Sequence, residues 1–339
     1  MSTDALITEP AEHESFAPPA WLANSHFQSI WPSLKLRRPL LAQRSRALLA
    51  ASRDTIVDCG DNVRLLGHES LQTTLDRPAS RNLVILLHGW EGSADSLYVL
   101  SLGGYLFELG CDVFRLNLRD HGPSHHLNED IFHSGRIAEV VGAVEAISRR
   151  YPERRLGIAG FSLGGNFALR VAVRAHARNL PLARAVAVSP VLRPTSTLDV
   201  LERGWFVYRQ YFIRKWKRSL AIKQQLFPRR FDFADILAQQ SITTMTEYLV
   251  ERYSEYGNLT EYLDSYAIIG ERLADLRVPS EILFALDDPI IPAADLRSLA
   301  TSPHLKITAM PHGGHCGFTD RLRGESWADR RAARALLED

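Results

Sequence analysis

Residues 155–169 read RLGIAGFSLGGNFAL, and the fold of the chain can be worked out from this stretch. Leu156 to Ala159 is a short apolar run without helical periodicity and predicts a buried strand, whereas the residues after Gly165 predict a helix. Between them, Ser162 has a glycine two positions before it and another two positions after it. A strand that turns sharply into a helix crowds its own backbone, so these two positions must lack a Cβ atom. The pattern predicts a strained turn that exposes the Ser162 hydroxyl beside a helix N-terminus.

Strand and helix patterns alternate on both sides of this turn. The further expected strands are 53–59, 63–70, 82–87, 111–116, 183–188, 279–285 and 305–309. The further expected helices are 96–109, 134–150, one that ends near His176, and 327–337. The Gly-Asp-Asn sequence at 60–62 predicts a hairpin between the first two strands. This alternation predicts a mostly parallel, eight-stranded sheet flanked by helices on both faces. Ligands of such sheets bind beyond the carboxyl ends of the strands.

The alternation stops between residues 191 and 277, and this region is expected to form a helical lid inserted after the sixth strand. Its expected helices are 201–220 and 242–256. We expect a flexible tail at 1–15 and a core made of residues 16–190 and 278–339. The aromatic and proline-rich segment 16–32 is expected to pack across the domain surface, with His26 in a structural role.

The first helix of this insertion combines aromatic and basic side chains. Five aromatic residues are expected to line an acyl pocket: Trp205, Phe206, Tyr208, Tyr211 and Phe212. Five basic residues would then face lipid headgroups or acidic groups of a substrate: Arg209, Arg214, Lys215, Lys217 and Arg218. The alternative is a helix packed on the core, with its basic side chains extended along the surface.

Composition excludes several classes of protein. The 339 residues are 45% hydrophobic and 23% charged, with a formal net charge of +1, which gives no field that would attract nucleic acid. Three scattered cysteines, Cys59, Cys111 and Cys316, have no metal-ligand spacing and favour a reduced, cytoplasmic protein. The first 14 residues lack the basic region of a signal peptide, and no apolar run approaches the roughly 18 residues of a membrane span. No cofactor and no metal are expected.

A serine hydroxyl needs a base to act as a nucleophile, and the base needs an acid to orient it. Ser162, Asp288 and His315 occur in the chain order expected for an α/β hydrolase, and each follows a predicted strand. Asp287 is the alternative acid, but the Asp-x-x-Ile-Pro spacing favours Asp288. His312 is the alternative base, but the glycines around His315 suit a loop that presents a ring into a tight site.

Two backbone N–H groups are expected to stabilise an oxyanion. One belongs to Leu163, at the start of the helix after the serine. The other belongs to Trp90, in the loop His88-Gly89-Trp90-Glu91-Gly92-Ser93 that follows a central strand. We expect His88 to order this loop rather than to transfer protons.

Several motifs together are similar to one known family. They are Pro18-Pro19-x-Trp21-Leu22-x-Asn24-x-His26-x-Gln28, the loop 88–93, Asn117-x-Arg119-Asp120-His121-Gly122, Gly160-Phe161-Ser162-Leu163-Gly164-Gly165-Asn166, Ala285-x-Asp287-Asp288-Pro289 and His312-Gly313-Gly314-His315-x-Gly317-Phe318. With these motifs, the chain resembles the YheT-like branch of the α/β-hydrolase superfamily over residues 16–320. Trp90 stands where leucine often occurs in that branch, and the lid matches least.

The resemblance implies an α/β-hydrolase fold and serine-dependent hydrolysis of carboxylic esters, with lipid esters or acylglycerols among the substrates of similar proteins. It also allows peripheral contact with a membrane. Two alternatives remain open at this point. The same triad could transfer an acyl group to an alcohol or a thiol, or the fold could bind a ligand without turnover.

Overall fold

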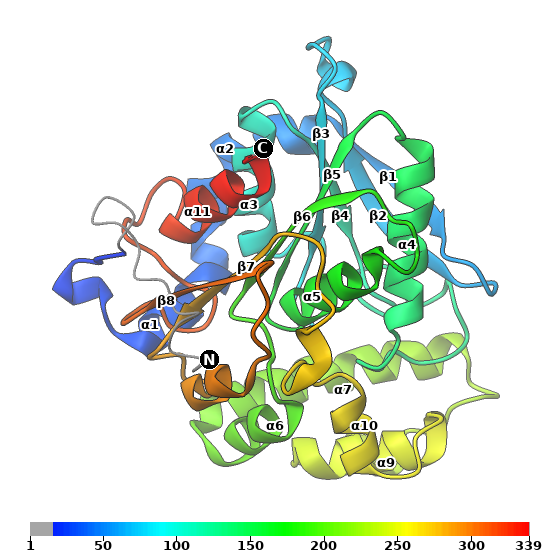
Figure 1. Cartoon of the computed structure of the whole chain (residues 1–339). Coiled ribbons are helices and arrows are strands. Elements are labelled where there is room, and N and C mark those ends of the chain that lie inside the picture. Colours follow the sequence, from blue (N-terminus) through cyan, green and yellow to red (C-terminus); the bar gives the residue numbers. More distant parts are fainter. Residues whose placement is uncertain (1–15, 339) are drawn as a thin grey trace.

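The computed structural model describes residues 16–338, so the predicted flexible tail at 1–15 lies outside the described residues. Within them, the predicted eight-stranded sheet is confirmed, with strand order β1-β2-β4-β3-β5-β6-β7-β8 (Figure 1). β1 and β2 pair antiparallel, as do β2 and β4, and the other neighbours are parallel. The connection between β1 and β2 is the predicted hairpin, and Gly60, Asp61 and Asn62 all have positive φ there.

The elements have the following bounds. The strands are β1 Ser52–Asp58, β2 Arg64–Ser70, β3 Asn82–Leu87, β4 Asp112–Leu116, β5 Arg155–Phe161, β6 Leu182–Val188, β7 Ser280–Ala285 and β8 Leu305–Met310. The α-helices are α1 Ser25–Ile30, α2 Arg38–Ala50, α3 Leu97–Glu108, α4 Ile137–Arg150, α5 Leu163–Ala175, α6 Pro194–Arg203, α7 Phe206–Leu226, α8 Ala234–Ala238, α9 Ile242–Tyr253, α10 Leu259–Ser265 and α11 Trp327–Leu337. Short 3-10 turns are η3 Ala20–Leu22, η4 Trp31–Ser33, η5 Lys35–Arg37, η6 Gln72–Leu75, η7 Glu271–Leu273 and η8 Ala293–Ser298.

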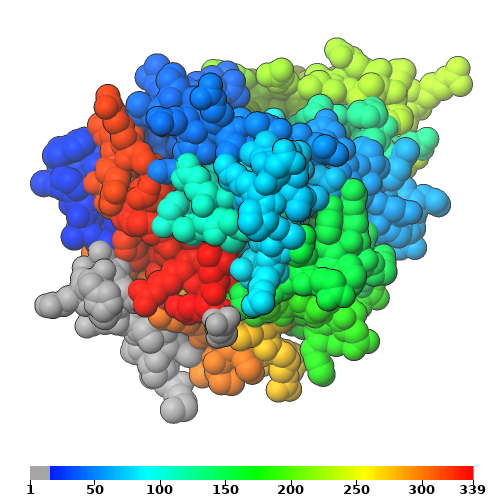
Figure 2. Space-filling view, turned by 90° about the horizontal axis from the view of Figure 1, so that it is seen from above, coloured from blue at the N-terminus to red at the C-terminus, as the bar shows by residue number. Residues whose placement is uncertain are grey.

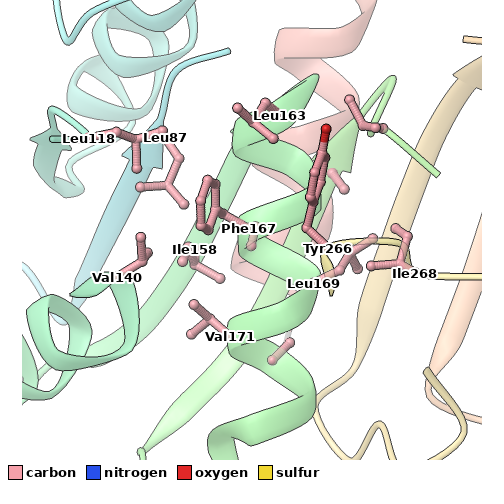
Figure 3. Packing of buried hydrophobic residues seen from close by; sticks show 14 of the residues in the cluster. Leu87, Leu118, Val140, Ile158, Leu163, Phe167, Leu169, Val171, Tyr266 and Ile268 are labelled. Carbon is pink, nitrogen blue, oxygen red and sulfur yellow. The ribbon is translucent and has the colours of Figure 1, made fainter. Parts of the chain in front are cut away.

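Two hydrophobic cores cover the two faces of the sheet. Successive side chains of a strand point to opposite faces, so β3 places Leu83, Ile85 and Leu87 in one core and Val84 and Leu86 in the other. The first core contains the apolar faces of α4 and α5, and Figure 3 shows side chains of α5 packed between β3 and the chain around residue 268. The second contains α2, α3 and α11. Burial on both faces explains why the central strands are continuous apolar runs.

The segment between β6 and β7 contains α6 to α10, which lie together beyond one end of the sheet (Figure 1). The sequence predicted one helix over 201–220, and this is wrong. The chain forms α6 and α7 with a break at Gly204 and Trp205, where a Cβ atom on Gly204 would lie 2.4 Å from the Val200 carbonyl oxygen. α9 ends at Tyr253, three residues before the predicted end at Tyr256.

The N-terminal region packs against the core as expected, although its helices were not predicted. α2 lies on α3, and α3 also contacts the C-terminal helix α11. Figure 2, seen from the side of the sheet opposite α6 to α10, shows the C-terminal segment in red beside the N-terminal segments in blue. No helix in the described part of the chain, residues 16–338, is both long and apolar enough to cross a membrane.

Candidate active site

The turn after β5 holds Ser162 in a strained backbone conformation. Its φ is 53° and its ψ is −118°, a region that a non-glycine residue rarely adopts. A Cβ atom on Gly160 would lie 2.1 Å from the Gly164 carbonyl oxygen, and one on Gly164 would lie 2.4 Å from the His88 carbonyl oxygen. Both positions must therefore be glycine. The turn folds closely on itself at Gly160, and the loop after β3 lies against it at Gly164. Within residues 16–338, the Ser162 hydroxyl has no hydrogen-bond partner within 3.5 Å, so it is available to a ligand.

The loop after β3 lies directly against this turn. A Cβ atom on Gly89 would be 3.3 Å from the Ser162 Cβ atom, and the Gly89 N–H donates to the Tyr98 hydroxyl at 3.1 Å. Among the described residues, the N–H groups of Trp90 and Leu163 have no hydrogen-bond acceptor. Unpaired N–H donors on the two segments that meet at the serine are groups of the kind that stabilise an oxyanion.

His88 is fully buried and orders the loop from inside. Its Nδ1 lies 2.7 Å from the Gly89 carbonyl oxygen, and its Nε2 accepts a hydrogen bond from the Leu118 N–H at 3.1 Å. Burial lowers the pKa of His88 to about 4, so the ring is neutral at physiological pH. A neutral ring with both nitrogens occupied connects two loops and has no proton to exchange with a substrate.

Asp288 and His315 are brought together by the loops after β7 and β8. Asp288 Oδ2 lies 2.9 Å from His315 Nδ1, while Asp288 Oδ1 accepts from the N–H groups of Ile290 and Ile291 at 2.8 and 3.0 Å. The Asp288 side chain is fully buried. A buried carboxylate with three partners fixes both the tautomer and the orientation of the imidazole that it contacts.

The charge of Asp288 decides how His315 titrates. Burial by itself would lower the pKa of His315, but the Asp288 carboxylate, followed by Cys316, favours the protonated ring. The pKa of His315 is therefore raised well above the ordinary value of 6.5. A base with a raised pKa holds more strongly the proton that it takes from a hydroxyl group.

Asp287 and His312, the alternative acid and base, are placed differently. Asp287 Oδ1 accepts from the Gly314 N–H at 2.9 Å, and its Oδ2 lies 3.4 Å from His312 Nδ1. The His312 side chain is about half exposed. Asp287 thus stabilises the loop that carries His315 and does not contact the His315 ring.

The turn that carries Ser162 (the serine turn) and the loop after β8 that carries His315 (the histidine loop) meet at the end of β6. The Val188 carbonyl oxygen accepts from the Ser162 N–H at 2.9 Å and from Cys316 Sγ at 3.6 Å. The Cys316 N–H donates to the Ser189 hydroxyl at 3.1 Å. Because both segments bond to the Val188 carbonyl oxygen, the residue after His315 is held beside the turn that carries Ser162. Across the described chain, no hydrogen bond joins Ser162 to His315, and such bonds are often long before a ligand binds.

Helix α1 holds the histidine loop from the outside, and the sequence reasoning missed this contact. The Ser29 hydroxyl accepts from the His315 N–H at 2.8 Å. The fully buried Gln28 side chain bonds to the Thr319 N–H at 2.7 Å and to the Thr319 carbonyl at 2.8 Å. A Cβ atom on Gly317 would lie 2.3 Å from the Gln28 carbonyl oxygen, so the glycines of this loop allow α1 to approach. The spacing Asn24-x-His26-x-Gln28 in the sequence was the available signal.

A cavity of about 110 Å³ opens onto Ser162. Trp90 and Leu163 line it as well, and α6, α7, α9 and α10 supply most of the rest. The lining is predominantly apolar, with aromatic and branched aliphatic side chains from these helices: Leu198, Leu201, Phe212, Trp216, Leu249 and Tyr253. A mostly apolar cavity beside a nucleophile suits an acyl chain or another apolar substituent.

Of the five aromatic residues predicted to bind substrate, Phe212 alone lines this cavity. Trp205, Phe206 and Tyr211 are exposed, and the buried Tyr208 hydroxyl instead lies 2.9 Å from His26 Nδ1. The sequence prediction of these four as pocket residues is therefore wrong in this structure. On α7, Phe212 and Trp216 are the residues that line the cavity. Trp216, which was not predicted as a pocket residue, lines the cavity and packs edge-on against Trp90 at 5.1 Å.

Helix α7 is attached to the core by two lysines. Lys223 is almost fully buried, and its Nζ lies 2.8 Å from Asp120 Oδ1. Lys215 Nζ donates to the Glu91 carbonyl oxygen at 2.6 Å. Lys215 was expected to face lipid headgroups or acidic groups of a substrate, but it binds the loop after β3, which agrees with the alternative of a helix packed on the core. These contacts fix the wall of the cavity relative to Trp90, which stacks on Phe212 at 5.0 Å.

Comparisons with known proteins agree with this fold. A family model described as alpha/beta hydrolase fold matches residues 82–322. The chain is 24% identical over 340 residues to "Putative esterase YheT" of Escherichia coli (strain K12), covering 97% of this chain and 94% of that protein. It is 24% identical over 253 residues to mouse monoacylglycerol lipase ABHD2, covering 69% of this chain and 59% of that protein.

Solved structures show the same fold. The esterase Pf2001 of Pyrococcus furiosus matches with a TM-score of 0.53 and 19% sequence identity, covering 86% of this chain and 92% of its own. A membrane phospholipase A, described as a bacterial virulence factor, matches with a TM-score of 0.54 and 18% identity, covering 89% of this chain and 91% of its own.

Proposed function

The chain belongs to the α/β-hydrolase fold family, and from this premise we propose that it hydrolyses carboxylic esters with Ser162 as the nucleophile. One observation carries the proposal. Ser162, Trp90 and Leu163 line one apolar cavity, the N–H groups of Trp90 and Leu163 are unpaired within the described residues, and the adjacent loop carries a histidine that is paired with a buried carboxylate. These groups support the proposal because they are the ones that a two-step acyl transfer requires.

In the proposed first step, the Ser162 oxygen forms a bond to the ester carbonyl carbon and its proton moves to His315. Asp288 stabilises the imidazolium that results, and the N–H groups of Trp90 and Leu163 stabilise the oxyanion. The carbon–oxygen bond to the alcohol then breaks, and the alcohol takes the proton from His315. In the second step, water attacks the acyl-enzyme in the same way, and the acid and the free serine are released. Neither step needs a cofactor.

The proposed substrates are esters with an apolar acyl chain, acylglycerols included. The apolar lining of the cavity supports this class, and relatives named monoacylglycerol lipase support it independently. We assign residues 16–190 and 278–339 to the hydrolase core and residues 191–277 to a lid. The contribution of α6, α7, α9 and α10 to the cavity lining supports the second assignment.

The proposal is tested with p-nitrophenyl butyrate and the Ser162→Ala variant. We expect kcat to fall by at least about 10⁴-fold, because no other nucleophile replaces the hydroxyl. Ser148→Ala is the matched control. Its hydroxyl donates to the Glu145 carbonyl on α4, away from the cavity, so its kcat should stay at the wild-type value. Retained turnover in Ser162→Ala would contradict the proposal. Product analysis with added alcohol distinguishes hydrolysis from acyl transfer.

A further inference from the structure

One face of α7 lies on the loop that carries the Trp90 N–H. The rings of Phe212 and Trp90 are stacked with their centroids 5.0 Å apart, and Trp216 packs edge-on against the same ring at 5.1 Å. Lys215 Nζ donates to the Glu91 carbonyl oxygen at 2.6 Å. Positions 212, 215 and 216 are spaced i, i+3 and i+4, so they share one face of the helix. α7 therefore contacts the side chain of residue 90 and the backbone of residue 91.

Residues 89–92 form a tight turn that orients the proposed oxyanion donor. The Gly92 N–H donates to the Gly89 carbonyl oxygen at 3.0 Å. This oxygen belongs to the same planar peptide group as the Trp90 N–H, so the bond that closes the turn also fixes the direction of that N–H. A Cβ atom on Gly92 would lie 2.9 Å from the Gly89 carbonyl oxygen. The direction of the Trp90 N–H thus depends on the shape of this turn.

Glu91 adopts a strained backbone conformation within the turn. Its φ is 55°, in the left-handed region that is unfavourable for a residue with a Cβ atom. Two contacts hold the peptide groups on either side of it. The Glu91 N–H donates to His121 Nε2 at 3.2 Å, and the Glu91 carbonyl oxygen accepts from Lys215. Glu91 cannot reach a negative φ without turning one of these peptide groups, so the two contacts oppose relaxation of the turn.

The Lys215 ammonium is committed to this backbone contact. Within residues 16–338, the Glu91 carbonyl oxygen is its only hydrogen-bond partner, and it forms no ion pair. A hydrogen bond from a charged donor is stronger than one between neutral groups. Lys217, two residues further along α7, has neither a hydrogen bond nor an ion pair in the described part of the chain. The two lysines therefore differ in the one contact that concerns the strained residue.

We propose that Lys215 is a positioning residue, which holds the strained turn at Glu91 and thereby keeps the Trp90 N–H directed at the oxyanion. The inference rests on the proposed function, because that function assigns the Trp90 N–H as an oxyanion donor. Lys215 acts through the backbone of the loop. The helix that forms part of the cavity wall thus also supports the oxyanion donor.

Kinetics of Lys215→Met with p-nitrophenyl butyrate test the proposal. We expect kcat to fall by about tenfold or more, because a misdirected donor loses part of what a complete oxyanion site provides. KM should change by less than about twofold, since the apolar lining that holds the acyl chain stays in place. Lys217→Met is the matched control. It removes the same charge from the same helix and should keep the wild-type kcat and KM.

A pair of ketones separates the oxyanion from the binding of the chain. With 1,1,1-trifluorodecan-2-one, the Ser162 oxygen bonds to the carbonyl carbon, its proton moves to His315, and the carbonyl oxygen becomes an oxyanion. Decan-2-one has the same chain but is too weakly electrophilic to form this adduct. In Lys215→Met, the Ki of the trifluoromethyl ketone should rise by the factor by which kcat/KM falls. The Ki of decan-2-one should stay at the wild-type value.

Glu91→Gly tests the strain itself, because glycine adopts a positive φ as readily as a negative one. With this substitution present, the turn keeps its shape with less help from α7. Lys215→Met should then lower kcat by less than about threefold relative to Glu91→Gly alone. A role of the Lys215 charge, acting on the oxyanion across space, would give the same loss with and without Glu91→Gly.

An unchanged kcat in Lys215→Met would overturn the positioning role and leave the esterase proposal in place. An equal rise in the two Ki values, or an equal loss with and without Glu91→Gly, would overturn it in the same way. Absence of p-nitrophenyl butyrate turnover by the wild-type protein would overturn both proposals.

Discussion

Two adjacent aspartates after β7 have different partners, and this decides which of them can act with His315. Asp288 Oδ2 lies 2.9 Å from the His315 ring, whereas Asp287 Oδ1 accepts from the Gly314 backbone. The sequence favoured Asp288 from its spacing to the following Ile and Pro. That reasoning could not predict the role of Asp287. Its contact with Gly314 depends on how the loop that carries His315 folds.

Asp288→Asn should lower kcat by about 10³- to 10⁴-fold, because the amide no longer stabilises the imidazolium and favours the wrong tautomer. Asp287→Asn is the matched control. It removes a loop contact but leaves the His315 pair intact, so kcat should fall by less than about tenfold. Steady-state kinetics with p-nitrophenyl butyrate compares the two. A larger loss in Asp287→Asn would show that the acid has been assigned to the wrong residue.

The pH dependence follows from the same pair. His315 must be neutral to accept a proton, and its pKa is raised well above 6.5 chiefly because the Asp288 charge outweighs burial. The rising limb of kcat/KM against pH should therefore have its midpoint above 6.5, and Asp288→Asn should move it to lower pH. The pair also stabilises the fold below the unfolded pKa of about 6.5, and this stability is lost as pH rises through the folded pKa. A midpoint that Asp288→Asn leaves unchanged would contradict this coupling.

At the scale of the elements, α1 connects the histidine loop to α7. Ser29 bonds to the His315 N–H, and the His26 ring lies 4.6 Å from Trp205 and 2.9 Å from the Tyr208 hydroxyl. The sequence predicted that segment 16–32 packs on the surface and that His26 is structural, and both agree with these contacts. The partners could not be predicted, because they lie about 180 to 290 residues further along the chain.

Gln28→Ala should lower the free energy of unfolding by roughly 3 kcal/mol, because it leaves the buried N–H and carbonyl of Thr319 without partners. It should also lower kcat more than it raises KM, since the loop that it releases carries His315. Urea unfolding and kinetics at a temperature where the variant is folded measure the two effects.

Gln225→Ala, at an exposed position of α7, is the control and should change neither quantity. Wild-type kcat in a destabilised but folded Gln28→Ala would contradict a positioning role for α1.

At the scale of the whole molecule, the sheet could be predicted well because its signals are local. β3 consists of the predicted residues 82–87, and the turn glycines identify the strand and helix on either side of Ser162. The inward face of α7 could not be predicted. Aromatic and basic residues occur on every face of α7. The periodicity of its sequence therefore does not distinguish Phe212, which lines the cavity, from Phe206, which is exposed.

Peripheral membrane contact remains a prediction, and the outer face of α7 supports it. Phe206 and Tyr211 are 61% and 43% exposed, Arg214 and Arg218 are exposed, and α7 contains no acidic residue. The protein should sediment with vesicles that contain anionic phospholipid, and Arg214→Glu should weaken this binding roughly fivefold or more.

Ile56→Ser removes an exposed apolar side chain from β1, away from α7, and should leave vesicle binding unchanged. Equal binding of wild type and Arg214→Glu would contradict the assignment of this face.

The central claim is that Ser162 is an activated nucleophile, and covalent labelling tests it most directly. The purified protein is incubated with a fluorophosphonate probe, digested, and analysed by mass spectrometry to locate the adduct. We predict a single adduct on Ser162, formed much more slowly in Asp288→Asn and absent in Ser162→Ala. A folded wild-type protein that forms no adduct, or one labelled on another residue, would contradict the account.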